Sequence, residues 1–408
     1  MRLKMICAGR EQGREYLGIQ SLKGRNMIPN DDRKLPRREF LTVSAGALVS
    51  AAVFPKAFPA QASAQVEYRN RQSQMTYRRL GRTGLMVSAI GMGGDDIRPD
   101  GTDYVLWAMD QGLNYFDTAP QYGGGLSERG YALVHKARGR DKVFQVTKVN
   151  VHPNRARVYQ AIFNSLSESE QAEIRNKVNE EVAKRGTEVP EYIGNYFNGQ
   201  AMGMRMHMTA NILSEKYRDK IDPQKEYKQF IIDSLKKSLK SLETDYVDCL
   251  LMRGIETPYE VKNTPEVFEA FEILKKQGKC RFLGFSAHTD PAGVLDAAID
   301  TGIYSMGMIA YHFLNHKWVN PVLEKAKKAD FGVLAMKSSR VVQNPFNRRQ
   351  NIPDRVKALN ELVPGDMTIF QKGFHWALQN PNLSGVVIGM TNMDMAKEDI
   401  PLAFEKKS

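Results

Sequence analysis

The chain has 408 residues, of which 42% are hydrophobic and 25% are charged. This composition is typical of a globular protein and excludes a disordered, collagen-like or coiled-coil chain. Residues 1–64 hold 11 basic and 5 acidic side chains, so half of the net charge of +12 lies there. The rest of the chain has only a mild basic surplus and no Lys/Arg run, which argues against nucleic-acid binding.

The first 64 residues have the organisation of an export signal. Arg37 and Arg38 precede a short apolar run at 42–54, and Ala-Ser-Ala at 62–64 supplies the small residues that a signal peptidase needs. The arginine pair resembles a twin-arginine (Tat) signal, so we expect the Tat export machinery to deliver the protein to the periplasm. An uncleaved signal acting as a membrane anchor is the alternative. The run of about 13 residues is shorter than the roughly 20 that span a bilayer.

Behind this segment, short apolar runs alternate with stretches of helical periodicity. The runs are rich in Val, Ile, Leu, Phe and Met, as expected for parallel strands that are buried on both faces. The predicted strands are 88–92, 114–118, 143–148, 246–252, 281–286, 306–311, 332–337 and 385–388. The predicted helices include 104–111, 230–242, 266–276, 292–301, 320–329 and 368–379.

This alternation predicts an α/β fold, a (β/α)8 TIM barrel within residues 65–408. A doubly wound sheet is the alternative, but no G-x-G-x-x-G follows the first predicted strand.

Residues 151–225 form a polar insertion of roughly 75 residues after the third strand, and without it the length approaches the ~250 residues typical of this barrel. Helical patterns occur in it at 167–185 and 208–219. The insertion begins at the end of the barrel that carries active sites, so we weigh a lid equally with a surface decoration.

Chemically active side chains gather at the ends of the second and third predicted strands. Asp117 ends the second strand, Tyr122 lies in the loop beyond it, and Lys148 ends the third. Adjacent barrel strands bring these ends together. A Lys ammonium beside a phenol depresses the phenol pKa, and a carboxylate holds the Lys charged. The three residues therefore predict a proton donor for a carbonyl oxygen, against the alternative of buried polar groups with structural partners.

The motifs around these residues resemble those of the aldo-keto reductase family. The matching segments are 80–84 (LGRTG), 90–93 (IGMG), 116–123 (FDTAPQYG) with 126–128 (LSE), 244–248 (TDYVD), 282–288 (FLGFSAH) and 387–392 (VIGMTN). The resemblance covers about 77–149 and 230–399 but not the insertion. It implies hydride transfer between NAD or NADP and a small-molecule carbonyl or alcohol substrate. Tyr122 would be the proton donor, with Lys148 and Asp117 adjusting its pKa.

One catalytic position departs from the family pattern. The residue at the end of the fourth strand is usually histidine and here is Arg253. A guanidinium is always charged and binds carboxylates or oxyanions, so we expect Arg253 to anchor an anionic substrate or to polarise the substrate oxygen. Two alternatives remain open. Arg253 could mark a non-catalytic binding or redox-partner barrel that has lost the reaction, or it could turn away to pair with Glu180 or Glu181 of the insertion.

The resemblance also implies where the cofactor binds. Ser286 matches the family's serine at the nicotinamide amide, whereas Ala287 and Met308 replace the usual Asn and Gln. Lys337 lies where many members stack an aromatic ring on nicotinamide. The predicted cofactor-binding residues are Gly93, Ser286, Lys337, Gly389, Met390, Thr391, Asn392, Glu398 and Asp399.

The choice between NAD and NADP stays open at this stage. The basic residues that hold the 2′-phosphate of NADP in many members fall on Gly389 and Met395. A phosphate without a cation is costly to bury, so NAD fits at least as well as NADP. Lys397 is nearby and could compensate.

No metal site is expected. The chain has three cysteines and no C-x-x-C, which excludes an iron–sulfur cluster as a cofactor. The Met- and His-containing segment 202–208 would suit copper, but methionine more often fills hydrophobic contacts. Cys249 and Cys280 are expected to be buried free thiols.

Overall fold

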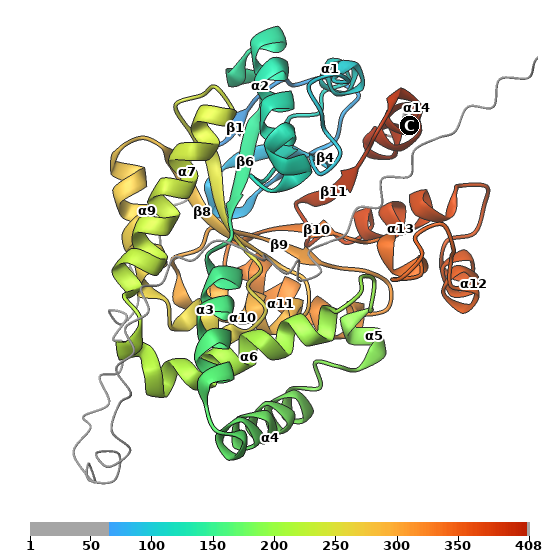
Figure 1. Ribbon diagram of the computed structural model, residues 1–408. Coiled ribbons are helices and arrows are strands. Elements are labelled where there is room, and N and C mark those ends of the chain that lie inside the picture. The colour runs from blue at the N-terminus through green and yellow to red at the C-terminus, as the bar shows by residue number, and fades with distance from the viewer. Residues whose placement is uncertain (1–64, 406–408) are drawn as a thin grey trace, which may run out of the picture. The chain divides into compact units, whose positions relative to one another are not determined.

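The computed structural model of the chain describes residues 65–405, so the predicted export signal at 1–64 lies outside the described residues. Eight parallel strands close into a barrel (Figure 1), which confirms the predicted (β/α)8 fold. The ring closes because the last strand pairs with the first. The strands are β4 (Ile90–Gly93), β5 (Tyr115–Asp117), β6 (Phe144–Val149), β7 (Val247–Arg253), β8 (Cys280–Ala287), β9 (Met306–Ala310), β10 (Gly332–Met336) and β11 (Gly385–Gly389).

A small three-stranded sheet precedes the barrel and was not predicted. It consists of β1 (Glu67–Tyr68), β2 (Tyr77–Arg79) and β3 (Leu85–Ser88) in the order β1-β3-β2. Its strands are too short to give a hydrophobic period. The first predicted strand, 88–92, was therefore placed too early, because Ser88 ends β3 and the barrel strand begins at Ile90.

This sheet lies at the end of the barrel where the strands begin, opposite the predicted site. Arg69, which follows β1, donates a hydrogen bond to the backbone carbonyl of Val143 at 2.6 Å. It also pairs with the buried carboxylate of Asp248 near the start of β7, at 3.1 Å. These contacts fix the sheet to the starts of β6 and β7.

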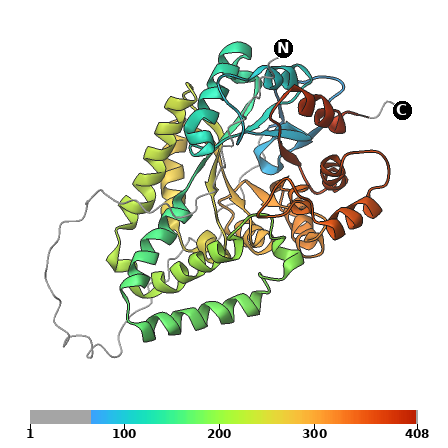
Figure 2. The same cartoon turned by 45° about the vertical axis from the view of Figure 1, so that its right-hand side comes forward.

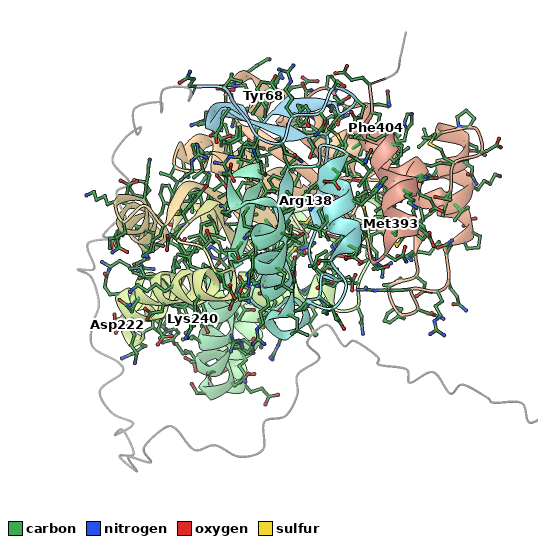
Figure 3. The ribbon with its side chains drawn as sticks, turned by 90° about the horizontal axis from the view of Figure 1, so that it is seen from above. Tyr68, Arg138, Asp222, Lys240, Met393 and Phe404 are labelled. Atoms are coloured by element: carbon green, nitrogen blue, oxygen red, sulfur yellow. The ribbon has the colours of Figure 1, made fainter. Side chains whose placement is uncertain are left out.

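The beginning and the end of the described chain meet beside this sheet. Met75 forms a backbone bridge with Phe404, and the backbone N–H of Thr76 donates to the carbonyl of Ala403 at 2.9 Å. Figure 3 shows Tyr68 and Phe404 along the same edge of the barrel. Residues near the end of the described chain thus form backbone hydrogen bonds with residues near its beginning.

Apolar side chains pack on both faces of the barrel strands, which explains their unbroken hydrophobic runs. One layer packs between the strands and the surrounding helices. The other fills the barrel interior and includes Leu85, Val87, Tyr115, Phe144, Val146, Cys249, Leu251, Met306, Met308, Leu334, Met336 and Val387. The barrel is thus a packed core, and polar chemistry is left to the strand ends.

Helices surround the strands largely as predicted. Asp290 caps α10 by accepting from the backbone N–H of Gly293, and Thr368 forms a capping box at α13. Helix α2 was not predicted, because it starts directly after glycines without a capping side chain. The helices are α1 (Asp103–Asp110), α2 (Leu126–Arg138), α7 (Phe230–Ser241), α8 (Pro258–Lys262), α9 (Pro265–Lys276), α10 (Pro291–Thr301), α11 (His316–Lys328), α12 (Pro353–Leu362), α13 (Ile369–Leu378) and α14 (Met393–Asp399).

Residues 151–225 form a helical layer at the end of the barrel where β6 ends (Figures 1 and 2). Helix α4 matches the helical pattern predicted at 167–185, and Ser167 caps it, whereas α3 was not predicted. Buried side chains of α3 and α6 pack together, and α4 packs against α6. The helices are α3 (Val151–Ser165), α4 (Glu168–Arg185), α5 (Pro190–Ile193) and α6 (Gln200–Tyr217). Within residues 65–405, we find no helix with the length and apolar character needed to cross a membrane.

Candidate active site

Asp117, Lys148 and Tyr122 meet at the ends of β5 and β6. The ammonium of Lys148 forms an ion pair with the carboxylate of Asp117 and donates to the backbone carbonyl of Thr118 at 2.9 Å. It also donates to the phenol oxygen of Tyr122 at 3.2 Å. Lys148 and Asp117 are almost fully buried. The structure therefore brings together three of the four predicted catalytic residues in direct contact.

The local chain path explains how Tyr122 reaches the ammonium. The strands β5 and β6 are parallel neighbours, with Asp117 opposite Val146. After β5 the chain makes a tight turn over Tyr122–Gly125, in which Gly123 and Gly124 have φ values of 57° and 66°. Residues with a Cβ rarely adopt this left-handed conformation, so the glycines let the turn fold back over the strand end.

The pKa of the Tyr122 phenol shifts in the direction opposite to the one predicted from the sequence. We expected Lys148 to depress it. Instead, burial raises the pKa of Tyr122, the Asp117 carboxylate raises it further, and only Arg253 lowers it. The charge of Lys148 is largely neutralised by Asp117. The phenol therefore stays protonated, as a proton donor requires.

Arg253, the fourth predicted catalytic residue, ends β7 beside this group. It lies opposite Ser286 in the β7–β8 register and donates to the side-chain oxygen of Asn150 at 3.3 Å. No carboxylate among residues 65–405 forms an ion pair with it. The alternative partner Glu181 lies 3.8 Å from Arg185 instead. The guanidinium therefore remains available to an anionic group at the site.

Lys337 adds a further cation at the end of β10. Its φ of 62° is unusual for a residue with a Cβ. Burial lowers the pKa of Lys337 to about 8, with Asp95 opposing the shift and Arg348 and Arg340 contributing to it. The strand end where the family resemblance implies an aromatic ring thus carries an amine with a pKa of about 8.

The predicted nicotinamide end of the cofactor site fits the residues present. Gly93 pairs with Gly389 in the β4–β11 register and with Asp117 in the β4–β5 register, so these strand ends are adjacent. The hydroxyl of Ser286 is buried and has no hydrogen-bond partner in the described part of the chain. A buried polar atom without a partner fits the nicotinamide amide that the family places there.

The residues predicted to hold the adenine end of the cofactor are only partly accessible to a ligand. The buried Met390 packs in the core, and Asn392 caps α14 by accepting from the backbone N–H of Met395 at 2.9 Å. Thr391 is exposed beside it. Of the two acidic residues, Glu398 is exposed, whereas Asp399 is buried and has a pKa raised to about 6 by burial and by Glu398. Only Glu398 offers its carboxylate to an outside ligand.

Several residues that surround the catalytic group were not predicted from the sequence. Asn150 bridges Arg253 and Gln121, to whose oxygen it donates at 3.2 Å. His288 lies near the site and contacts Tyr196 of the insertion at 2.9 Å. His288 ends the segment 282–288, which resembles the family, so that segment could have indicated its place near the site. Tyr196 belongs to no such motif, and nothing in the sequence indicated its contact with His288.

The segment 202–208 has a structural role in packing. Met204 and Met208 are buried, and His207 forms a hydrogen bond with Glu260 at 2.6 Å. Cys249 and Cys280 are buried free thiols, as expected. In residues 65–405 there is no group of three or more His, Cys, Asp or Glu side chains that could hold a metal ion.

Comparisons with known proteins identify the family of the chain. The model of the aldo/keto reductase family matches residues 187–406, and the chain belongs to this family of oxidoreductases. The chain resembles the uncharacterized oxidoreductase YqkF of Bacillus subtilis with 28% identity over 208 residues, 46% of this chain and 63% of that protein. It resembles the L-galactose dehydrogenase of Arabidopsis thaliana with 23% identity, over 82% of this chain and 90% of that protein.

A solved structure shares the fold. The holo form of an aldo-keto reductase from Bacillus halodurans superposes with a TM-score of 0.53 and 21% identity, over 80% of this chain and 90% of that chain. At this identity the likeness concerns the barrel alone.

Proposed function

We propose that the chain is an exported oxidoreductase that transfers hydride between NAD or NADP and a carbonyl or alcohol substrate. The observation that carries this proposal is the direct contact of Lys148 with both Asp117 and Tyr122. Family membership and the orphan hydroxyl of Ser286 support it. The similarity to a plant enzyme named for dehydrogenation of L-galactose agrees with this class of reaction.

In the reductive direction, a nicotinamide cofactor held beside Gly93 and Ser286 would supply the hydride that the carbonyl carbon accepts. Tyr122 donates its phenolic proton to the carbonyl oxygen as negative charge develops there. Lys148 donates to the phenol oxygen at 3.2 Å and stabilises the phenolate that remains. Asp117 keeps the ammonium charged and oriented. The raised pKa keeps Tyr122 protonated, so the resting site holds the proton that the reductive step requires.

The substrate is an anionic carbonyl compound. Arg253 has no acidic partner among the described residues, and Lys337 adds positive charge after β10 at the same end of the barrel. In a site partly shielded from water, opposite charges attract strongly. A carboxylate close to the reacting carbonyl therefore gains binding energy that a neutral aldehyde lacks.

The cofactor preference follows from the end of β11. Gly389 and Met395 offer no cation to a 2′-phosphate, and the exposed Lys397 is adjacent to the exposed Glu398, whose carboxylate fits an unphosphorylated ribose or the adenine better. NAD is therefore the cofactor we favour.

Export by the Tat route rests on Arg37 and Arg38, which lie outside the described residues.

The test uses the full-length protein with NADH and with NADPH. We expect one of them to bind, measured by fluorescence, and to be oxidised in the presence of a keto acid. Tyr122→Phe should lose at least ~10²-fold in turnover, as expected for a lost general acid, while cofactor binding persists. Failure to bind either cofactor contradicts the proposal. Binding without turnover in the wild type favours the non-catalytic barrel.

A further inference from the structure

The residue that follows β8 (Cys280–Ala287) faces the candidate active site. Side chains alternate between the two faces of a strand. Those of β8 that pack outward against the helices are Leu283, Phe285 and Ala287. Ser286 and the next position in the opposite series, His288, therefore face the barrel axis. In the β7–β8 register Ser286 lies opposite Arg253, so the imidazole lies just beyond the guanidinium at the catalytic end of the barrel.

The insertion brings a buried tyrosine against this imidazole. Tyr196 lies between α5 and α6, and its phenol oxygen is 2.9 Å from Nδ1 of His288. The turn before it is held by Arg355 of α12, which donates to the backbone carbonyl of Gly194 at 2.7 Å. The side-chain oxygen of Gln200 accepts from the backbone N–H of Tyr196 at 3.2 Å. Contacts on both sides thus fix the position of the phenol.

The hydrogen bonds of Tyr196 place the ring hydrogen of His288 on Nδ1. The phenol donates its single hydrogen to the backbone carbonyl of His288 at 3.3 Å, so it accepts from Nδ1 of the same residue. Burial lowers the pKa of His288 well below its usual value, which keeps the ring neutral. Three cations lower this pKa further: Lys337, Arg253 and Lys148. A neutral imidazole has one N–H, so with the hydrogen on Nδ1 the Nε2 atom is an acceptor.

Nε2 of His288 is available to a ligand. The imidazole is half-buried, and no group among residues 65–405 forms a hydrogen bond with Nε2. A carbonyl oxygen and a carboxylate both accept hydrogen bonds, so neither can pair with this lone pair. The complementary group on a substrate is a donor. The charges of Arg253 and Lys337 would repel an ammonium, which leaves a neutral hydroxyl as the donor that fits.

We propose that Nε2 of His288 accepts a hydrogen bond from a substrate hydroxyl close to the reacting carbonyl, and that Tyr196 of the insertion is the positioning residue that keeps Nε2 an acceptor. The substrates are then hydroxylated keto or aldehyde acids, as opposed to their deoxy analogues. This inference rests on the proposed function and narrows its substrate class. It also gives residues 151–225 a part in substrate selection, because the residue that sets the tautomer comes from the insertion.

Hydroxypyruvate and pyruvate test the proposal, because they share the carboxylate and the keto group and differ by one hydroxyl. A site with a polar group that pairs with a substrate hydroxyl discriminates against the analogue that leaves this group without a partner. We expect kcat/KM of the wild type to be at least about 10-fold higher for hydroxypyruvate. Glycerate should bind to the protein with NAD more tightly than lactate, measured by calorimetry, which checks the preference without turnover.

Four variants assign the preference to the imidazole. His288→Leu removes the acceptor and should bring the ratio of kcat/KM for the two keto acids close to one. His288→Gln retains an accepting oxygen, so part of the preference should remain. Tyr196→Phe releases the tautomer and should lower the ratio. Tyr192→Phe is the matched control and should keep the wild-type ratio, because the Tyr192 hydroxyl joins the insertion to the barrel through Asp290 and not through His288.

The tautomer can be measured independently of the reaction. Nitrogen-15 NMR of the imidazole, assigned by its loss in His288→Gln, should show the Nδ1–H tautomer in the wild type and a mixture in Tyr196→Phe. A structural effect of Tyr196→Phe alone would lower kcat/KM for both keto acids alike and leave the tautomer unchanged.

The outcomes separate this inference from the proposed function. If the wild type reduces no carbonyl compound, the proposed function fails and this inference with it. If the wild type is active but does not distinguish the two keto acids, or if His288→Leu keeps the wild-type ratio, only the inference is wrong. An Nε2–H tautomer in the wild type, or an equal change of the ratio in Tyr192→Phe and Tyr196→Phe, overturns the role of Tyr196.

Discussion

His207 of α6 donates a hydrogen bond from Nδ1 to the buried carboxylate of Glu260 in α8, at 2.6 Å, and thereby joins the insertion to the barrel. Arg155 and His152 of α3 each lie 3.8 Å from the same carboxylate. The other oxygen accepts from the backbone N–H of Thr257 at 3.1 Å. Glu260 is thus the common partner of two insertion helices.

Glu260→Gln should destabilise the protein by about 3–5 kcal/mol. The variant leaves the buried guanidinium of Arg155 and the imidazole of His207 without their anionic partner, and an unpaired buried charge is costly. The free energy of unfolding from chemical denaturation measures the effect. Glu173→Gln, which breaks an exposed pair with Lys177, is the control and should leave the free energy of unfolding almost unchanged.

The contribution of this pair should depend on pH in both directions. Burial opposes ionisation of Glu260, but His207 outweighs it and lowers the pKa to about 2, so the stabilisation is lost as pH falls from 4.5 towards 2. Burial also opposes protonation of His207, but Glu260 raises the pKa above 6.5, so stabilisation is lost as pH rises through that raised value. The difference in unfolding free energy between wild type and Glu260→Gln should therefore be largest between these limits. A difference that is flat from acid to alkaline pH would contradict the pairing.

Lys337 should make the binding of anionic substrates weaken in mild alkali. With a pKa of about 8, its amine is a cation below that pH and neutral above it. We expect the KM for a keto acid to rise through this range in the wild type and to change little in Lys337→Gln. A neutral aldehyde provides the control, because its KM should follow pH alike in both proteins.

Arg253→His should shift the substrate ranking towards neutral aldehydes. Loss of a charge-assisted contact to a carboxylate should lower kcat/KM for keto acids by about 10-fold or more, since such contacts are worth ~1.5–3 kcal/mol. A panel of keto acids, sugar acids and neutral aldehydes measures the ranking. If the wild type prefers neutral aldehydes and the variant leaves the ranking unchanged, Arg253 is not an anion anchor.

Replacement of both Arg37 and Arg38 by Lys should keep the precursor in the cytoplasm. A receptor that recognises the guanidinium pair by its planar geometry does not accept two ammonium groups in its place. Fractionation of host cells, with detection of the protein in each compartment, provides the measurement. Normal delivery of the variant would show that residues 1–64 act as a general secretory signal.

Much of the barrel could be predicted from the sequence because its strands are buried on both faces. The strand ending at Lys148 was located closely, since its apolar run stands out from polar surroundings. The small sheet of β1, β2 and β3 was not predicted, because strands of two to four residues show no alternation of apolar and polar side chains. Helix α2 was not predicted, because glycines precede it and no capping side chain marks its start.

The site was predictable only where it lies on the barrel. Asp117, Tyr122 and Lys148 follow from the geometry of adjacent strand ends. The direction of the Tyr122 pKa could not be foreseen, because it depends on burial and on how fully Asp117 neutralises Lys148. The contact between Tyr196 and His288 joins residues 92 positions apart through a segment without motifs, so no local pattern could indicate it.

The seam where β4 pairs with β11, reinforced by the bridge from Met75 to Phe404, has a consequence for biosynthesis. Because β4 is the first strand of the ring along the chain and β11 the last, a ribosome has to synthesise every strand of the barrel before the ring can be sealed. Any cellular factor that binds residues 1–64 during translation therefore meets a chain whose barrel is still open.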